Sequence, residues 1–118
     1  MENLFYINDT HKKAFTNILN NYHFGVEHLC LCYCITSVKH FPKLHYFDEN
    51  WNLSDVWYNT QNHRVHPNEI LLIELGKSLQ SNTKMNIGSG IAHWNESQYR
   101  VAMNAILIRR FGRIIVDL

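Results

Sequence analysis

Apolar residues recur with helical spacing in four stretches of the chain, and these stretches predict four main helices. In the first stretch the apolar residues lie at i, i+3, i+4 and i+7, while lysine and asparagine side chains occupy the opposite face. These apolar residues are Phe15, Ile18, Leu19 and Tyr22. The predicted helices cover residues 10–22, 26–38, 67–80 and 95–111.

The stretch that we expect to organise the fold is 93–112, in which only Asn104 is polar between Val101 and Ile108. An apolar surface would cover most of the circumference of such a helix, so we expect the rest of the chain to pack around it. The predicted core draws on all four helices. Its members are Phe15, Ile18, Leu19, Leu29, Tyr33, Leu72, Leu75, Met103 and Ile106.

The ends of the last helix carry clear signals. Asn95 and Gln98 have the spacing of a capping box, and Gly112 follows the last helical residue as a typical terminator. The polar residues of this helix recur at i, i+4 and i+8, so they form the single stripe that can face water or a ligand. They are Glu96, Arg100 and Asn104.

The remaining segments are less regular. Residues 43–66 are predicted to form either a packed functional loop or a pair of short helical turns, and 81–94, with its two glycines, is predicted to be a second loop. The tail 113–118 is apolar and either pairs as a strand with 4–7 or docks on the core. The fold class is therefore mainly α: one compact domain, 1–118, of about four helices, with at most a small two-stranded pairing of the termini.

Composition narrows the function classes. The net charge of the 118 residues is +1, so no overall field draws the chain to nucleic acid or to an anionic membrane. The start of the chain lacks the apolar run of a signal peptide, and no apolar run of about 18 residues would span a membrane. We therefore expect a cytoplasmic protein without a membrane partner.

Three cysteines alternate at Cys30, Cys32 and Cys34 within one predicted helix. Neighbours at this spacing lie about 200° apart around a helix, so the three thiols cannot converge on one metal ion. Free cysteine behaves as a small buried hydrophobic residue, and core packing is the favoured interpretation.

Other catalytic chemistry has weak support. Of the eight histidines, only His63 and His66 have a short metal-ligand spacing, and neither Asp nor Cys completes a set nearby. A surface or capping role for this pair is favoured, with a metal-binding protein or hydrolase as an alternative. Neither a nucleophile elbow nor a phosphate-binding glycine loop is present. We therefore predict a protein that is not an enzyme and needs no cofactor.

An aromatic and acidic segment in the middle of the chain is the candidate binding surface. Trp51, Trp57 and Tyr58 lie among polar residues, and exposed Trp and Tyr are the usual anchors of protein interfaces. Asp48, Glu49 and Asp55 would give this surface, residues 45–66, an acidic rim. Packing of both tryptophans between helices is an equally weighted alternative.

A nucleic-acid interface is the competing prediction. It would use the basic residues of the C-terminal region, and its affinity would fall steeply with salt. These residues are Arg100, Arg109, Arg110 and Arg113.

Three segments resemble an uncharacterised family of small helical proteins of Gram-positive bacteria and their phages: LFYINDTHKKAF, FDENW and HWNESQYRVAMNAILIRR. The resemblance implies a helical single domain encoded by a mobile element, and it brings no established activity. His11, at one of the matching positions, is either a site residue or a histidine packed beside Trp94. By analogy we predict a protein-binding module, an inhibitor or immunity-type modulator of a larger host or phage protein. The oligomeric state stays open, with a homodimer among the options.

Overall fold

The computed structural model describes residues 4–38 and 66–116, and within them every regular element is a helix. The elements are α1 (Asp9–Asn21), α2 (Val26–Thr36), α4 (Pro67–Ser81), α5 (Ile87–His93), α6 (Glu96–Phe111) and α7 (Arg113–Val116). The mainly helical fold class is confirmed, and α1, α2, α4 and α6 match the four predicted helices to within two residues at each end.

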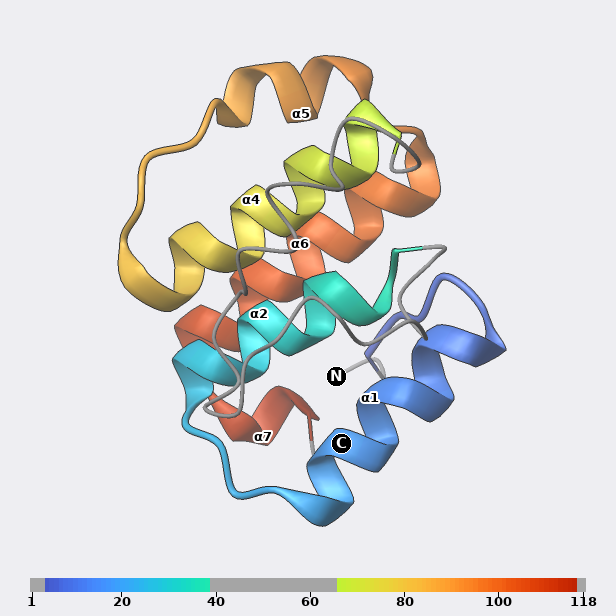
Figure 1. The fold of residues 1–118 in the computed structure, drawn as a ribbon, viewed down its shortest axis with the longest axis vertical. Helices are drawn as coiled ribbons and strands as arrows, with labels where there is room; N and C mark the ends of the chain where they lie inside the picture. Colours follow the sequence, from blue (N-terminus) through green and yellow to red (C-terminus); the bar gives the residue numbers. More distant parts are fainter. Residues whose placement is uncertain (1–3, 39–65, 117–118) are drawn as a thin grey trace.

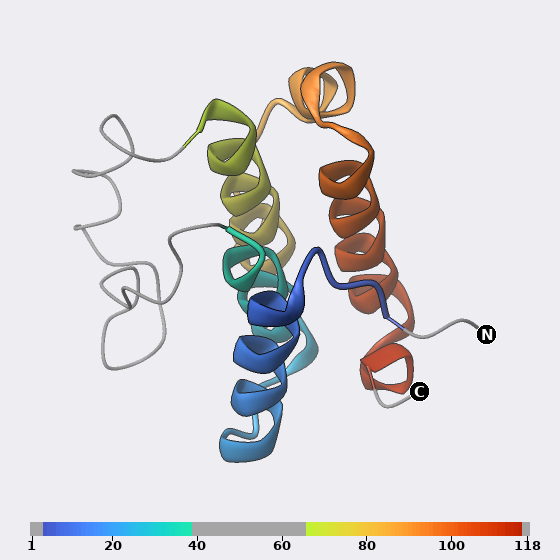
Figure 2. The same cartoon turned by 90° about the vertical axis from the view of Figure 1, so that its right-hand side faces the viewer.

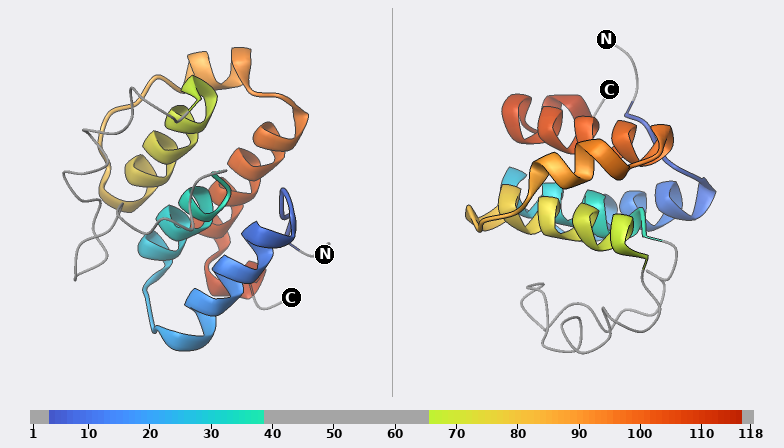
Figure 3. Two further views of the ribbon diagram at one scale, coloured as in Figure 1. Left: turned by 45° about the vertical axis from the view of Figure 1, so that its right-hand side comes forward. Right: turned by 90° about the horizontal axis from the view of Figure 1, so that it is seen from above.

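The helices, labelled in Figure 1, are arranged in two layers that the side view of Figure 2 separates. In one layer α1, α2 and α4 lie side by side with α2 in the middle, and α2 makes its closest packing against α4. Helix α6 forms the second layer and packs on α2 and α4, as Figure 2 shows from the side. Seen from above, α7 continues the layer of α6, and α5 crosses one end of the molecule (Figure 3).

Helix α2 is the most deeply buried element. Every side chain from Leu29 to Thr36 is buried, and this stretch contains no charged residue. Gly76 in the middle of α4 allows the closest approach, because a Cβ atom there would lie 2.9 Å from the Cβ atom of Cys34. Helix α2, rather than the last helix, is therefore the central element of the described part of the chain, where it packs against α1, α4 and α6.

The prediction that α6 is surrounded by the core is wrong. Its buried residues are Val101, Ala102, Ala105 and Ile108. Met103 and Ile106, which were predicted in the core, are 40% and 36% exposed. Leu19 is half-buried. The other predicted core residues are buried: Phe15, Ile18, Leu29, Tyr33, Leu72 and Leu75.

Side chains cap the helices where the sequence predicts it. The Asn95 side chain accepts a hydrogen bond from Gln98 N at 2.8 Å, and the Gln98 side chain accepts one from Asn95 N at 3.1 Å. The predicted capping box at the start of α6 is thus confirmed. His66 caps α4, since its Nδ1 atom accepts a hydrogen bond from Asn68 N at 3.1 Å.

Two predicted segments have a different structure. The predicted loop 81–94 contains the short helix α5, whose start is capped by the Asn86 side chain. Gly90 lies under the Trp94 ring, where a Cβ atom would come within 2.5 Å of Cη2, so this glycine provides room for the indole instead of an unusual backbone angle. The tail forms the helical turn α7, and its Ile115 is buried in the core, as the alternative of a docked tail predicts. Strand pairing of the termini is consequently absent from the described part of the chain.

Candidate functional site

The outward side of α6 exposes a row of large apolar side chains, which we call the α6 face. Its members are Tyr99, Met103, Ile106, Leu107 and Phe111. Their spacing along the helix places them on adjoining positions of one side, opposite to the side that packs on α2 and α4. Tyr99 is 42% exposed and Phe111 is 51% exposed. Contiguous apolar surface of this kind commonly marks an interaction site.

The flank of α6 next to this face is occupied by the N-terminal segment. The Asn104 side-chain oxygen accepts a hydrogen bond from Phe5 N at 3.0 Å, and the guanidinium of Arg100 lies over the Phe5 ring at 4.2 Å. The polar stripe that was predicted to face water or a ligand therefore holds the N-terminal segment in place at two of its three positions.

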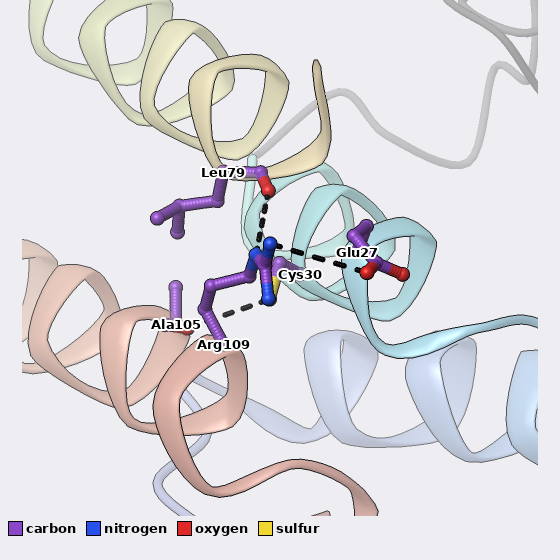
Figure 4. A network of polar contacts seen from close by, with 5 residues as sticks. All are labelled: Glu27, Cys30, Leu79, Ala105 and Arg109. Atoms are coloured by element: carbon purple, nitrogen blue, oxygen red, sulfur yellow. Dashed lines mark hydrogen bonds and ion pairs between the residues drawn. The ribbon is translucent and has the colours of Figure 1, made fainter. Parts of the chain in front are cut away.

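The four arginines do not share one surface. Arg100 and Arg109 are nine residues apart, which places them on opposite sides of an α-helix. Arg109 is held at the junction of three helices (Figure 4): its Nε donates to Leu79 O at 3.1 Å, and its guanidinium lies 3.9 Å from the Glu27 carboxylate. Leu79 is in the last turn of α4, so Arg109 satisfies a terminal carbonyl of that helix. Arg110 lies over the ring of Phe111, and Arg113 is on α7. The structure therefore does not place the four arginines of the predicted basic interface on one surface.

The three cysteines are core residues, as predicted, and their thiols are all buried. Burial raises the pKa of Cys30 and of Cys32 to about 12 and raises the pKa of Cys34 as well. Thiolates are the reactive form of cysteine, so none of these residues is suited to nucleophilic attack at neutral pH. In residues 4–38 and 66–116, no group of three or more His, Cys, Asp or Glu side chains is placed to hold a metal ion.

His11 is buried between α1 and α2. Its Nδ1 atom accepts a hydrogen bond from Ile7 N at 3.1 Å, and its Nε2 atom lies 2.9 Å from Tyr33 O, to which it donates. The rings of Tyr6 and Tyr33 pack against it, while Trp94 lies over Gly90, so the predicted packing of His11 beside Trp94 is wrong. Burial lowers the pKa of His11 to about 4. Both ring nitrogens are used within the core, which indicates a structural role.

Most residues of the predicted aromatic and acidic surface lie outside the described part of the chain. They are Asp48, Glu49, Trp51, Asp55, Trp57 and Tyr58, together with His63 of the predicted metal pair. His66 is described, and its capping hydrogen bond agrees with the favoured interpretation of that residue. Among the described helices, none combines the length and the apolar character that crossing a bilayer requires.

The α6 face was missed by the sequence analysis, although the chain carries a signal for it. Large apolar residues occupy one side of α6, whereas Ala102 and Ala105 occupy the other. Small side chains mark the side on which a helix can approach its neighbours closely, so they could have identified the outward side as the one with larger residues.

Comparison of the chain with protein families, with curated proteins and with solved structures gives no match.

Proposed function

We propose that this protein is a non-enzymatic protein-binding module whose binding surface is the α6 face. In this proposal it acts as an inhibitor or immunity-type modulator of a larger protein. The exposure of five large apolar side chains along one side of α6 is the observation that carries the proposal. Aromatic residues and methionine are enriched in protein interfaces, and this face contains Tyr99, Phe111 and Met103.

The geometry also specifies the manner of recognition. Tyr99, Met103 and Ile106 follow one another at intervals of four and three residues. Anchors with this spacing are the ones that a helix presents to an apolar groove or to the apolar side of another helix. We therefore expect the partner to offer an apolar groove or helix rather than a flat polar surface.

A protein partner fits this surface better than a nucleic acid does. Of the arginines in the competing prediction, Arg109 is engaged with Leu79 and Glu27, and Arg100 is engaged with Phe5. Nucleic-acid binding relies on several cations that reach phosphates from one surface. The exposed side of α6 is instead mostly apolar between its ends.

A capture experiment tests the proposal. The purified protein is immobilised at low density and incubated with lysate of the source cells, alongside Met103→Lys and Asn20→Lys variants. Met103 is in the middle of the α6 face, whereas Asn20 is an exposed polar residue on α1, so the same charge is added at both places. We expect the wild type and the Asn20→Lys variant to retain a protein that the Met103→Lys variant loses, because a buried unpaired ammonium disfavours an apolar interface.

Equal recovery by all three baits, with unfolding curves that show each one folded, would contradict the use of the α6 face. The binding surface would then have to be sought elsewhere, for example at residues 45–66. Recovery that disappears after nuclease treatment or in high salt would favour the nucleic-acid alternative instead.

A further inference from the structure

We infer that the α6 face binds a second copy of this chain, with the two α6 helices antiparallel about a twofold axis near Met103. The inference rests on the proposed function, because it names an occupant of the same surface. It is carried by two observations: the apolar face of α6 has no covering element among the described residues, and the charges at its two ends are opposite.

The charges lie in a simple pattern along the helix. Glu96, Met103 and Arg110 are spaced by seven residues each, so all three share one side of α6. Glu96 lies in the first turn and Arg110 in the last turn, about 10 Å along the axis on either side of Met103 at 1.5 Å per residue. Both residues are exposed. The face is thus negative at one end, positive at the other and mostly apolar between them, with Arg100 at its edge beside Phe5.

This pattern selects one orientation for a second copy. In an antiparallel pair centred near Met103, Glu96 of each copy lies opposite Arg110 of the other, and the symmetry forms the ion pair twice. A parallel pair would place Glu96 beside Glu96 and Arg110 beside Arg110, with like charges at both ends. The antiparallel orientation also sets the negative end of one helix dipole beside the positive end of the other.

The apolar residues between the charges fit the same arrangement. Tyr99 and Ile106 lie on either side of Met103 at the intervals of four and three residues that characterise the seam of paired helices. Leu107 widens the seam on one side. Beyond it, Arg100 and Asn104 contact Phe5 of the N-terminal segment.

The available area indicates a weak, reversible dimer. The five residues of the α6 face are between 36% and 51% exposed. At roughly 200 Å² for a large apolar side chain, these fractions amount to about 400 Å² per copy. With the charged ends included, the total area buried by both copies is about 1,000 to 1,200 Å², at the lower limit of specific interfaces. We expect a dissociation constant of roughly 1 to 100 µM.

Sedimentation of the purified full chain measures this equilibrium without any other protein present. We expect the wild type to shift from monomer to dimer between about 1 and 500 µM, the range that an interface of this size predicts. The Glu96→Arg and Arg110→Glu variants each place like charges opposite one another twice, and each should weaken the dimer at least about tenfold. The double variant, Glu96→Arg with Arg110→Glu, restores opposite charges and should return to within about threefold of the wild type.

The charge exchange separates an interface effect from a folding effect, because the double variant carries both substitutions and is expected to regain the dimer. A wild type that remains monomeric at about 500 µM would overturn the inference, since an interface of the stated size would associate below that concentration. A double variant as weak as the single variants would overturn the antiparallel arrangement. Neither result alters the capture of a larger protein by the immobilised chain, so failure of the dimer and failure of the proposed function are distinguishable.

Discussion

Helices α2 and α6 are both rich in apolar residues, but they occupy opposite environments. Helix α2 is enclosed by α1, α4 and α6, and its Leu29–Thr36 stretch is entirely buried. Helix α6 packs on α2 and α4 along one side and exposes large apolar residues on the other. The difference follows from the charged residues that α6 carries and that the buried stretch of α2 lacks.

The side chains explain which helix is enclosed. From Leu29 to Thr36, helix α2 carries no charge, and the hydroxyls of Thr36 and Ser37 donate hydrogen bonds to carbonyls one turn earlier, so its polar groups are satisfied internally. Helix α6 has charged residues along its length, and Glu96, Arg100, Arg109 and Arg110 are all exposed. Burying every side of α6 would bury charges at high cost, so only its side with Ala102 and Ala105 is enclosed.

The largest expected difference in stability is between two isoleucine substitutions, one on α2 and one on α6. Ile35→Ala on α2 removes a side chain with 0% exposure and should lower the free energy of unfolding by about 2 to 5 kcal/mol. Ile106→Ala on α6 removes one that is 36% exposed, and it should cost less than about 1 kcal/mol. Urea denaturation at low protein concentration, where α6 is not paired with a second copy, measures both.

Equal losses for the two variants would contradict the difference in environment. A large loss for Ile106→Ala that appears only at high protein concentration would have another meaning. It would place Ile106 in an interface between copies, as inferred above, because association stabilises the folded state by mass action.

Because His11 is buried between α1 and α2, the stability of the protein should also depend on pH. Burial lowers its pKa from 6.5 to about 4 in the folded state. Between these values the unfolded chain binds more protons at this residue, so stability is full above pH 6.5 and falls as the pH is lowered towards 4. The loss at this residue is on the order of 3 kcal/mol.

Urea denaturation of the wild type and a His11→Gln variant between about pH 7 and pH 4.5 isolates this contribution, because the other titrating groups are common to both proteins. We expect the variant to be less stable at pH 7 and to lose less stability on acidification than the wild type. Parallel pH profiles for the two proteins would show that His11 does not titrate differently in the folded and unfolded chains.

The sequence predicts the helices of this fold better than it predicts their environments. Helical spacing, the Asn95–Gln98 capping box and the proline start of α4 are local features, and all three are present in the structure. Burial depends on which helices pack against one another. The apolar residues of the α6 face do not by themselves indicate that they are exposed. Helix α5 was missed for a related reason: Gly88 and Gly90 suggest a turn, but the room at Gly90 is needed for the Trp94 ring.

The residues of the candidate site were also harder to predict than the helices, because they depend on which sides of the helices are buried. The predicted arginine surface treated residues that are close in sequence as close in space, whereas the helix turns Arg100 and Arg109 to opposite sides. The α6 face follows from the buried side of α6, for which Ala102 and Ala105 are the signal in the sequence. His66 was correctly predicted because a cap depends on its immediate neighbours alone.

The smallest expected effect concerns Arg109, through which α6 contacts α2 and α4. This guanidinium donates to Leu79 O at the end of α4 and lies 3.9 Å from Glu27 on α2, while its side chain is 42% exposed. Water screens such an ion pair, so Arg109→Gln should lower the free energy of unfolding by no more than about 1 kcal/mol. Arg110→Gln, the adjacent substitution on the exposed side, should change it by less than about 0.5 kcal/mol. Thermal unfolding of both variants at low and high salt measures the difference, which should shrink as salt rises. If Arg110→Gln were the more destabilising of the two, the assignment of Arg109 to the helix junction and of Arg110 to the open face would have to be reversed.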